Sequence, residues 1–468
     1  MSTFCHAVFS VACLSPALIA CPTTQPESIV PQRTLPGDSV VYAIIRQQVD
    51  SKRSTGIVVG LVDADGKRRV VAYGARTPNG AALDGQSVFE IGSVTKVFTG
   101  TLLADMMLRG EVRLDDPVQR FLPAGVRVPT RAGRQITLLD LATQSSGLPR
   151  LPGNFTPRQP DNPYADYSVQ QLYDFLSGYT LPRDIGSRYE YSNLGVGLLG
   201  HALALRAGTS YEALLTERVL APLGMQDTRI TLTPELRERF AAGHDEAGKE
   251  VSPWDLPTLA GAGALRSTAN DLLTFVAANL DTTRQPLGRA FALAHAPRMR
   301  TDDPSLRVGL TWHVIEAFGR TVVWHNGGTG GYHAFIGFGP AAREGVVVLS
   351  SSTTSIDDIG FHLLDERAPL EQAPKARVEV NLDPALLRAY AGDYQLTPTF
   401  HLVISRERSG LFVQATGQQK LQLFAESETR FFLKAVDAQI TFVKDASGRV
   451  TQLVLHQGGQ DQVARKVR

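Results

Sequence analysis

Cysteine is nearly absent from this sequence of 468 residues, and its distribution excludes several kinds of chemistry. The three cysteines, Cys5, Cys13 and Cys21, all lie within the first 21 residues. The rest of the chain therefore has no thiol that could form a disulfide, undergo oxidation or bind zinc. An H-E-x-x-H pattern, the usual helical zinc site of metalloproteases, is missing as well. We expect the folded protein to need no metal or other cofactor.

A strong excess of charge of either sign is also lacking. The formal net charge is +1, and a short basic run, Lys67-Arg68-Arg69, lies close to Asp63 and Asp65. Proteins that bind nucleic acids usually gather their basic residues on one face, so a polynucleotide partner is not expected. Hydrophobic residues make up 43% and charged residues 20% of the chain, which is typical of a compact globular protein.

An apolar segment occupies residues 4–21, too short for a comfortable membrane span but typical of an export signal. It ends in Leu18-Ile19-Ala20-Cys21, which resembles the bacterial lipobox, where the cysteine is lipidated after cleavage. No Lys or Arg precedes Arg33, whereas an export signal normally begins with basic residues. We predict a signal peptide over residues 1–21, a tether over 22–37, and a protein that is periplasmic or lipid-anchored to the bacterial envelope at Cys21. The alternative is a frayed apolar N-terminus.

The length of the chain favours a large domain with at least one smaller unit. Strand-like runs occur near both ends of the larger part, and helical periodicity fills the middle. The predicted strands are 56–62, 69–73, 321–324, 334–338 and 345–350, and the predicted helices are 97–109, 168–177, 194–207, 211–220 and 356–366. This order predicts a sheet built from both ends of a domain that spans residues 38–367. A Pro- and Gly-rich loop, residues 148–164, is expected to border the substrate cleft.

The pattern changes after a polar segment that carries two prolines, which predicts a linker over residues 368–380. Short strand-like runs separated by turns follow it to the end of the chain. The predicted strands are 402–405, 411–414, 431–433, 440–443 and 450–455. We therefore expect residues 381–468 to form a separate small all-β domain.

The sequence Ser93-Val94-Thr95-Lys96 pairs a nucleophile with a base at the predicted start of a helix. A free serine has almost no anion at neutral pH, so amide or ester cleavage through serine needs a base beside the hydroxyl. Residues three apart share a helix face, and a partly desolvated amine can have its pKa lowered enough to take a proton. The S-x-x-K pattern alone is weak, because one chance match is expected in a chain of about this size.

Two further segments supply groups that such a reaction uses. Tyr191-Ser192-Asn193 follows a turn-rich stretch, and a phenol can move protons while an amide binds a carbonyl and the lysine. Residues 325–331 are rich in glycine and lie beside a predicted strand, where a ligand can approach the backbone. The N–H groups of Ser93 and Gly328 could then form an oxyanion hole. Taken singly, each segment is also compatible with a packed tyrosine or a glycine-rich hairpin turn.

In order and spacing, residues 89–96, 191–193 and 325–327 resemble the three motifs of class C β-lactamases and their penicillin-binding relatives. The connecting segments 109–117, 140–149 and 222–225 agree too, and the resemblance covers about residues 40–365. It implies an α/β (α+β) sandwich, in which an antiparallel sheet is flanked by helices and a helical lobe frames the cleft. It also implies a small β-barrel, opened by residues 390–394.

The resemblance implies a role for each matching residue. Ser93 is the acylated nucleophile, and Lys96 and Tyr191 form the acid/base pair. Asn193 and His325 contact the substrate, and Gly327 and Gly328 lie beside it.

Two departures limit what the resemblance implies about substrate. The third motif is His325-Asn326-Gly327 where β-lactamases usually have Lys-Thr-Gly, and Thr95 replaces the usual Ser or Ala. A histidine is only partly charged near neutrality, so it holds a substrate carboxylate less firmly than lysine does. Turnover of β-lactams is therefore less certain than acylation.

Three functions stay open at this point. The first is a serine hydrolase that cleaves an amide in a β-lactam or a D-amino-acid peptide through an acyl-enzyme at Ser93. The second is an esterase of small acyl esters, and the third is a non-catalytic penicillin-binding sensor or binding lipoprotein. An α/β-hydrolase would normally show G-x-S-x-G, and no such stretch occurs here.

Overall fold

The computed structural model describes residues 34–77, 80–283, 286–371, 379–397, 400–407, 410–416, 420–433, 438–457 and 460–467. The predicted signal peptide, residues 1–21, and most of the predicted tether lie outside the described residues. So does most of the predicted linker, residues 372–378. Among the described helices, none combines the length and the apolar character needed to cross a membrane.

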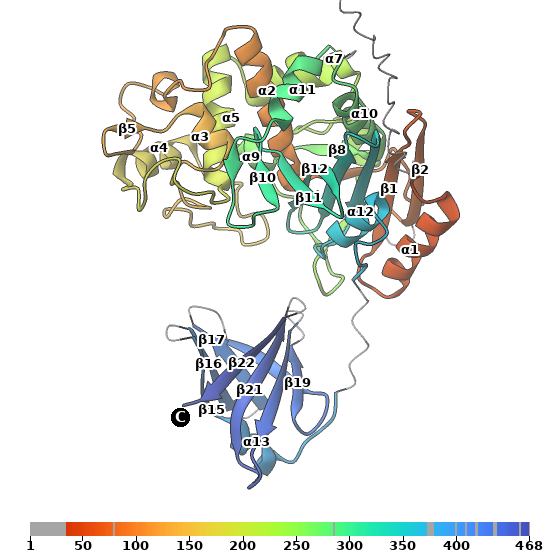
Figure 1. Ribbon diagram of the computed structural model, residues 1–468, viewed down its shortest axis with the longest axis vertical. Coiled ribbons are helices and arrows are strands. Elements are labelled where there is room, and N and C mark those ends of the chain that lie inside the picture. The colour runs from red at the N-terminus through yellow and green to blue at the C-terminus, as the bar shows by residue number, and fades with distance from the viewer. Residues whose placement is uncertain are drawn as a thin grey trace, which may run out of the picture. The chain divides into compact units, whose positions relative to one another are not determined.

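An eight-stranded antiparallel sheet organises the larger part of the chain (Figure 1). Its spatial order is β2-β1-β14-β13-β12-β11-β10-β9, so the first two strands pair with the last ones, as the sequence predicts. The strands are β1 (Gly56–Val62), β2 (Arg68–Gly74), β9 (Met299–Arg300), β10 (Leu306–Val308), β11 (His313–Ala317), β12 (Arg320–Gly328), β13 (His333–Gly339) and β14 (Glu344–Ser350). Strand β12 continues through Gly328, four residues beyond the predicted end at Trp324.

The strands in the centre of this sheet are buried on both faces, which explains why their sequences are almost wholly apolar. Along β1, Ile57 and Val59 pack with α1 (Asp38–Asp50) and α12 (Asp357–Leu364), whereas Val58 belongs to the core on the opposite face. Gly60 also faces that second core, where Leu273 of α10 (Ala269–Leu280) leaves no room for a side chain. Burying each aliphatic side chain contributes about 1.5–3 kcal/mol, so the two faces hold the sheet between layers of helices.

A helical lobe adjoins the face of the sheet to which Val58 belongs (Figure 1). This lobe contains the helices that carry the first two motifs. Its core helix α2 (Thr95–Leu108) is buried nearly all round and contacts α5 (Asn193–Ala207), α9 (Ala260–Gly263) and α11 (Gly288–His295). The other helices are α3 (Leu138–Ala142), α4 (Val169–Gly178), α6 (Tyr211–Leu215), α7 (Ala221–Leu223) and α8 (Pro234–Glu238). The predicted helix 211–220 is not continuous, because a π-helical turn occupies Thr216–Leu220. Three short ladders complete this part: β3 (Val88–Glu90) with β8 (Arg266–Thr268), β4 (Thr130–Arg131) with β5 (Arg134–Gln135), and β6 (Gly243–His244) with β7 (Glu250–Val251).

Within the described residues, the segment from 384 onward forms one helix and a closed antiparallel barrel. The elements are α13 (Pro384–Tyr390), β15 (Gly392–Thr397), β16 (Phe400–Glu407), β17 (Gly410–Ala415), β18 (Lys420–Ala425), β19 (Arg430–Leu433), β20 (Ala438–Lys444), β21 (Val450–Gln457) and β22 (Gln460–Lys466). Tyr390 and Phe442 stack in its core with ring centroids 4.4 Å apart. The five predicted strands are present, and α13, β15, β18 and β22 are additional.

Candidate active site

Ser93 lies in a single 3-10 turn, Gly92–Val94, between strand β3 and helix α2. Gly92 has φ of +46°, and a methyl group in its place would lie 2.8 Å from the carbonyl oxygen of Gly328. Glycine is therefore required both by the backbone conformation and by the close approach of β12. The turn presents Ser93 at the entrance of α2, as the sequence predicts.

Lys96, one turn further along, reaches back to the serine and is completely buried. Its Nζ lies 2.8 Å from Ser93 Oγ, 2.8 Å from Asn193 Oδ1 and 2.7 Å from the carbonyl oxygen of Ala262. Burial lowers the pKa of Lys96 well below its ordinary value, and the nearby charge of Arg150 lowers it further. Two of the three oxygens can only accept hydrogen bonds, so in the neutral form of the amine they can take its two N–H groups. Its lone pair is then left for the proton of Ser93.

Tyr191 and Asn193 approach the same point from the start of α5. Ser192 caps this helix by accepting a hydrogen bond from Gly195 N at 2.8 Å, which fixes the residues on either side. The Tyr191 ring centroid lies 4.8 Å from Lys96 Nζ. Burial raises the pKa of the Tyr191 phenol, while a hydrogen bond with Ser93 lowers it in part. Tyr191 is therefore protonated at neutral pH and able to donate.

The end of strand β12 packs directly against the turn that carries Ser93. A methyl group on Gly327 would lie 2.6 Å from Ser93 N and would also collide with Ile91 O. Gly327 is therefore a strand residue whose backbone contacts the turn that carries Ser93. The sequence predicts that the strand ends at Trp324, before the glycine-rich segment, whereas the strand continues through Gly328. Gly328 is exposed, and it lines the cleft together with Ser93.

His325 is the one predicted substrate-binding residue that is absent from the cleft lining. Its side chain is fully buried and stacks on His313, with ring centroids 4.8 Å apart. Burial lowers the pKa of His325 well below its ordinary value and lowers that of His313 to about 4. Both imidazoles are neutral near pH 7. The His325 ring is not among the groups that line the cleft, and its predicted contact with substrate stays a prediction.

A cleft of about 420 Å³ opens over Ser93. Residues from the expected border loop contribute to it, as do two segments that the sequence did not single out. Its lining consists of Ser93, Arg150, Tyr164, Tyr191, Asn193, Trp254, His313, Asn326, Gly327 and Gly328. Of the predicted site residues, Ser93, Tyr191, Asn193, Gly327 and Gly328 meet in this cleft, and Lys96 lies directly behind Ser93.

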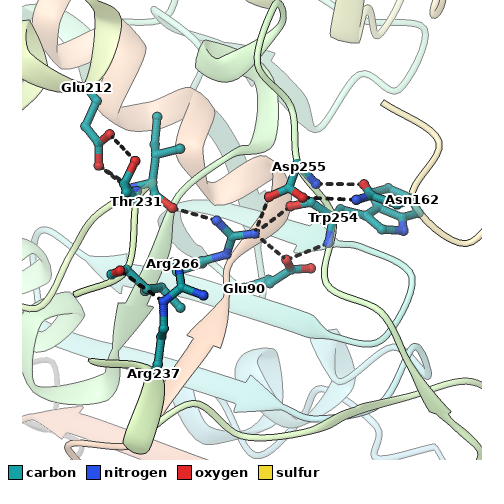
Figure 2. A network of polar contacts seen from close by, with 10 residues as sticks. Glu90, Asn162, Glu212, Thr231, Arg237, Trp254, Asp255 and Arg266 are labelled. Carbon is teal, nitrogen blue, oxygen red and sulfur yellow. Dashed lines mark hydrogen bonds and ion pairs between the residues drawn. The ribbon is translucent and has the colours of Figure 1, made fainter. Parts of the chain in front are cut away.

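A partly buried network of polar contacts surrounds Trp254, which lines the cleft (Figure 2). Glu90 Oε1 accepts a hydrogen bond from Trp254 N at 2.8 Å, and Arg266 Nη2 lies 3.4 Å from Glu90 and 3.1 Å from Asp255. Asp255 and Asn162 exchange two hydrogen bonds, of 2.8 and 3.0 Å, which tie the 148–164 loop to this segment. Burial raises the pKa of Glu90 to about 7. Sequence reasoning missed this network, because its members are far apart in the chain.

The site combines a serine, a buried amine that can accept its proton, and a phenol that can donate one. Such an arrangement, on an antiparallel sheet with a helical lobe, defines a serine hydrolase. Among the described residues, no group of three or more His, Cys, Asp or Glu side chains is placed to hold a metal ion.

Comparison with known proteins gives the family. The chain belongs to the beta-lactamase family, whose model, described as "Beta-lactamase", matches residues 41–366. A second model, described as "Domain of unknown function (DUF3471)", matches residues 376–466, which contain the barrel.

Similar curated proteins carry the names of β-lactamases and peptidases. The D-alanyl-D-alanine-carboxypeptidase/endopeptidase AmpH of Escherichia coli strain K12 is 34% identical over 274 residues, covering 58% of this chain and 67% of its own. A beta-lactamase of Pseudomonas fluorescens is 28% identical, covering 67% of this chain and 92% of its own. Penicillin-binding protein 4* of Bacillus subtilis strain 168 is 25% identical and covers 81% of this chain and 88% of its own.

Solved structures agree with the fold. A class C β-lactamase superposes with a TM-score of 0.62 at 22% identity, covering 71% of this chain and 97% of its own. A β-lactamase/D-alanine carboxypeptidase from Pseudomonas syringae gives a TM-score of 0.62 at 21% identity, covering 71% and 99%. The predicted antiparallel sheet with a helical lobe is confirmed.

Proposed function

We propose that the protein forms an acyl-enzyme through Ser93 and cleaves an amide in a β-lactam or in a D-amino-acid peptide. The observation that carries this proposal is the 2.8 Å approach of Ser93 Oγ to the fully buried Lys96 Nζ, inside a cleft that Tyr191 also lines. The names of the relatives, which include a D-alanyl-D-alanine carboxypeptidase and β-lactamases, support this choice of substrate.

The proposed reaction follows from the protonation states of the three groups. Ser93 Oγ attacks the carbonyl carbon while its proton passes to the neutral Lys96 amine. The oxyanion is stabilised by the backbone N–H groups of Ser93 and Gly328. The C–N bond then breaks as the Tyr191 phenol protonates the leaving nitrogen and is itself reprotonated from the lysine ammonium. Water cleaves the resulting ester and restores Ser93.

A second candidate function is hydrolysis of small acyl esters. It is favoured by the neutral state of both His325 and His313, because the third motif then offers no cation to a substrate carboxylate. An alkoxide leaves more readily than an amine, so an esterase needs less help from Tyr191.

A substrate panel distinguishes the two functions. Steady-state kcat/KM is measured with a penicillin, a cephalosporin, an acyl-D-alanyl-D-alanine peptide and a short-chain ester, using protein that begins at residue 34. Preference for the β-lactams or the peptide supports the proposal. Cleavage of the ester alone, with no covalent adduct from either β-lactam, contradicts it and supports the esterase.

We also propose that the protein is exported, either to the periplasm or as a lipoprotein anchored through Cys21. The apolar run of residues 4–21 and its lipobox-like end support this proposal. Intact mass of the protein recovered from cell envelopes tests it. Cleavage before Cys21 with added lipid mass supports the anchor, cleavage without lipid supports a periplasmic protein, and an intact N-terminus contradicts export.

A further inference from the structure

Arg150 is the one charged side chain among the residues that line the cleft. The other lining residues are neutral side chains or glycines, and His313 is neutral because burial lowers its pKa to about 4. Lys96 lies behind the lining and is fully buried. The electrostatic character of the open cleft is therefore set by one guanidinium group.

The guanidinium of Arg150 is also available to a ligand. Arg150 is exposed, and in the described part of the chain no carboxylate lies within 4.0 Å of it. Its guanidinium carbon lies 5.1 Å from the centroid of the Tyr191 ring, so the cation lies beside a catalytic side chain that also lines the cleft. Many other arginines of the protein are paired with a carboxylate, such as Arg266 and Arg53.

The backbone on both sides of Arg150 is fixed to the second motif. Leu194 N donates to Arg150 O at 3.2 Å, and Ser192 Oγ donates to Pro149 O at 2.6 Å. The cation is therefore carried by an anchored stretch of the 148–164 loop. Such anchoring reduces the entropy that a binding group loses when it engages a ligand.

The third motif does not offer a cation to an anion in the cleft. Asn326 lines the cleft, and its Nδ2 donates to Asp357 Oδ2 at 2.5 Å. Burial raises the pKa of Asp357 to about 6, so this carboxyl is mainly ionised at neutral pH. The neutral His325 lies beside it in the same strand. A substrate carboxylate beside Asn326 would find that amide hydrogen-bonded to the Asp357 carboxyl and no charged imidazole in the third motif.

We propose that Arg150 forms the anion subsite of this cleft and binds the carboxylate of the substrate. This inference rests on the proposed function, because penicillins and D-amino-acid peptides both carry a carboxylate near the scissile amide. Guanidinium and carboxylate match in shape as well as in charge, and can form two parallel hydrogen bonds. The 148–164 loop, through Arg150, then determines the specificity for substrates that bear a carboxylate. The third motif does not supply this specificity.

Acylation kinetics test the proposal. The second-order rate of adduct formation is followed by intact mass with benzylpenicillin and with its methyl ester, for the wild type, Arg150→Gln and Arg150→Lys. Arg127→Gln, at an exposed arginine outside the cleft lining, is the matched control. The rates are compared on the pH-independent plateau of each protein, where the effect of Arg150 on the pKa of Lys96 does not enter. There we expect Arg150→Gln to slow benzylpenicillin roughly 10- to 100-fold, to change the methyl ester by less than about threefold, and Arg150→Lys to retain an intermediate rate.

The ratio of the two rates separates binding of the carboxylate from other effects. If Arg150→Gln slows both compounds equally, Arg150 acts on Lys96 or on the loop, and the inference is overturned. No change with either compound overturns it as well. If the wild type reacts with neither compound, the proposed function fails instead. The inference is then decided by the same variants with p-nitrophenyl hemisuccinate against p-nitrophenyl acetate, where an unchanged ratio overturns it.

Discussion

Lys96 Nζ lies 2.8 Å from Ser93 Oγ, and no part of the Lys96 side chain is exposed to solvent. Burial and hydrogen bonding to Asn193 and Ala262 hold the amine where its lone pair faces the serine. A base in this position has to be neutral before the reaction starts, and the lowered pKa of Lys96 favours the neutral form. The predictions below follow from this relationship and from the groups that maintain it.

Replacing Lys96 by methionine should remove the base while keeping a side chain of similar length in the core. We expect kcat/KM to fall roughly 10²- to 10⁴-fold, because the serine loses its proton acceptor. The change leaves Asn193 Oδ1 and Ala262 O without a donor, so the thermal midpoint should fall moderately. Circular dichroism checks the fold, and Lys249→Met, at an exposed lysine, is the control. Activity within tenfold of the wild type would remove Lys96 from its proposed role.

The pH dependence of kcat/KM should depend on the charge of Arg150, because this charge changes the pKa of Lys96. The positive charge of Arg150 lowers the pKa of Lys96, so more of the amine is neutral at a given pH. Arg150→Gln should therefore raise the pKa of Lys96 and move the acidic limb of kcat/KM to higher pH. The profile is measured with a neutral ester, so that carboxylate binding does not enter. A limb that stays in place, as expected for Arg127→Gln, would show that the two groups are not coupled.

Two neighbouring glycines should respond very differently to one added methyl group. Gly327→Ala places a methyl 2.6 Å from Ser93 N, whereas the nearest atom to a methyl on Gly328 is His333 Cδ2 at 3.7 Å. We expect Gly327→Ala to cost about 1–3 kcal/mol of unfolding free energy and most of the activity, because the Ser93 turn must move. Gly328→Ala should keep the stability of the wild type. Denaturant unfolding and kcat/KM check both variants, and equal effects would contradict the contact between β12 and this turn.

Glu90 should make the stability of the protein depend on pH. Burial raises its pKa from 4.5 to about 7, so the folded state binds the proton more tightly than the unfolded state. The free energy of unfolding should therefore fall as pH rises from 4.5 to about 7, by on the order of a few kcal/mol.

Glu90→Gln removes this titration while keeping an oxygen for Trp254 N. Unfolding is measured between pH 4 and pH 8 for the wild type, Glu90→Gln and the exposed control Glu246→Gln. The stability of Glu90→Gln should vary less over this range than that of the other two proteins. An identical slope in all three would show that Glu90 does not titrate there.

The central reaction groups could be predicted from the sequence because they lie in short local motifs. Ser93 and Lys96 are three residues apart on one helical turn, so local geometry alone brings them together. The strands 56–62 and 345–350 were predicted for a similar reason, since fully apolar runs of that length are typical of buried strands. Residue roles implied by the family resemblance stay predictions, as do the domain boundaries and the export signal.

Other features depend on contacts between distant segments and could not be predicted. Glu90 and Arg266 are paired through the β3–β8 ladder. The sequence around either residue contains no pattern that predicts this pairing. The burial of His325 follows from stacking on His313 of the neighbouring strand, a register that the glycine-rich sequence does not specify. Arg150 lies in a loop without periodicity, so its place in the cleft emerges only from the anchoring of that loop.

The central claim is that Ser93 is the acylated residue, and peptide mapping after reaction with a penicillin tests it most directly. Wild type and Ser93→Ala, both starting at residue 34, are mixed with benzylpenicillin and analysed by intact mass and by tandem mass spectrometry of the digest. We predict an adduct of one penicillin on Ser93 in the wild type, and none in Ser93→Ala, which should keep its fold and nearly its thermal midpoint. An adduct on another residue, or turnover that survives in Ser93→Ala, would contradict the account.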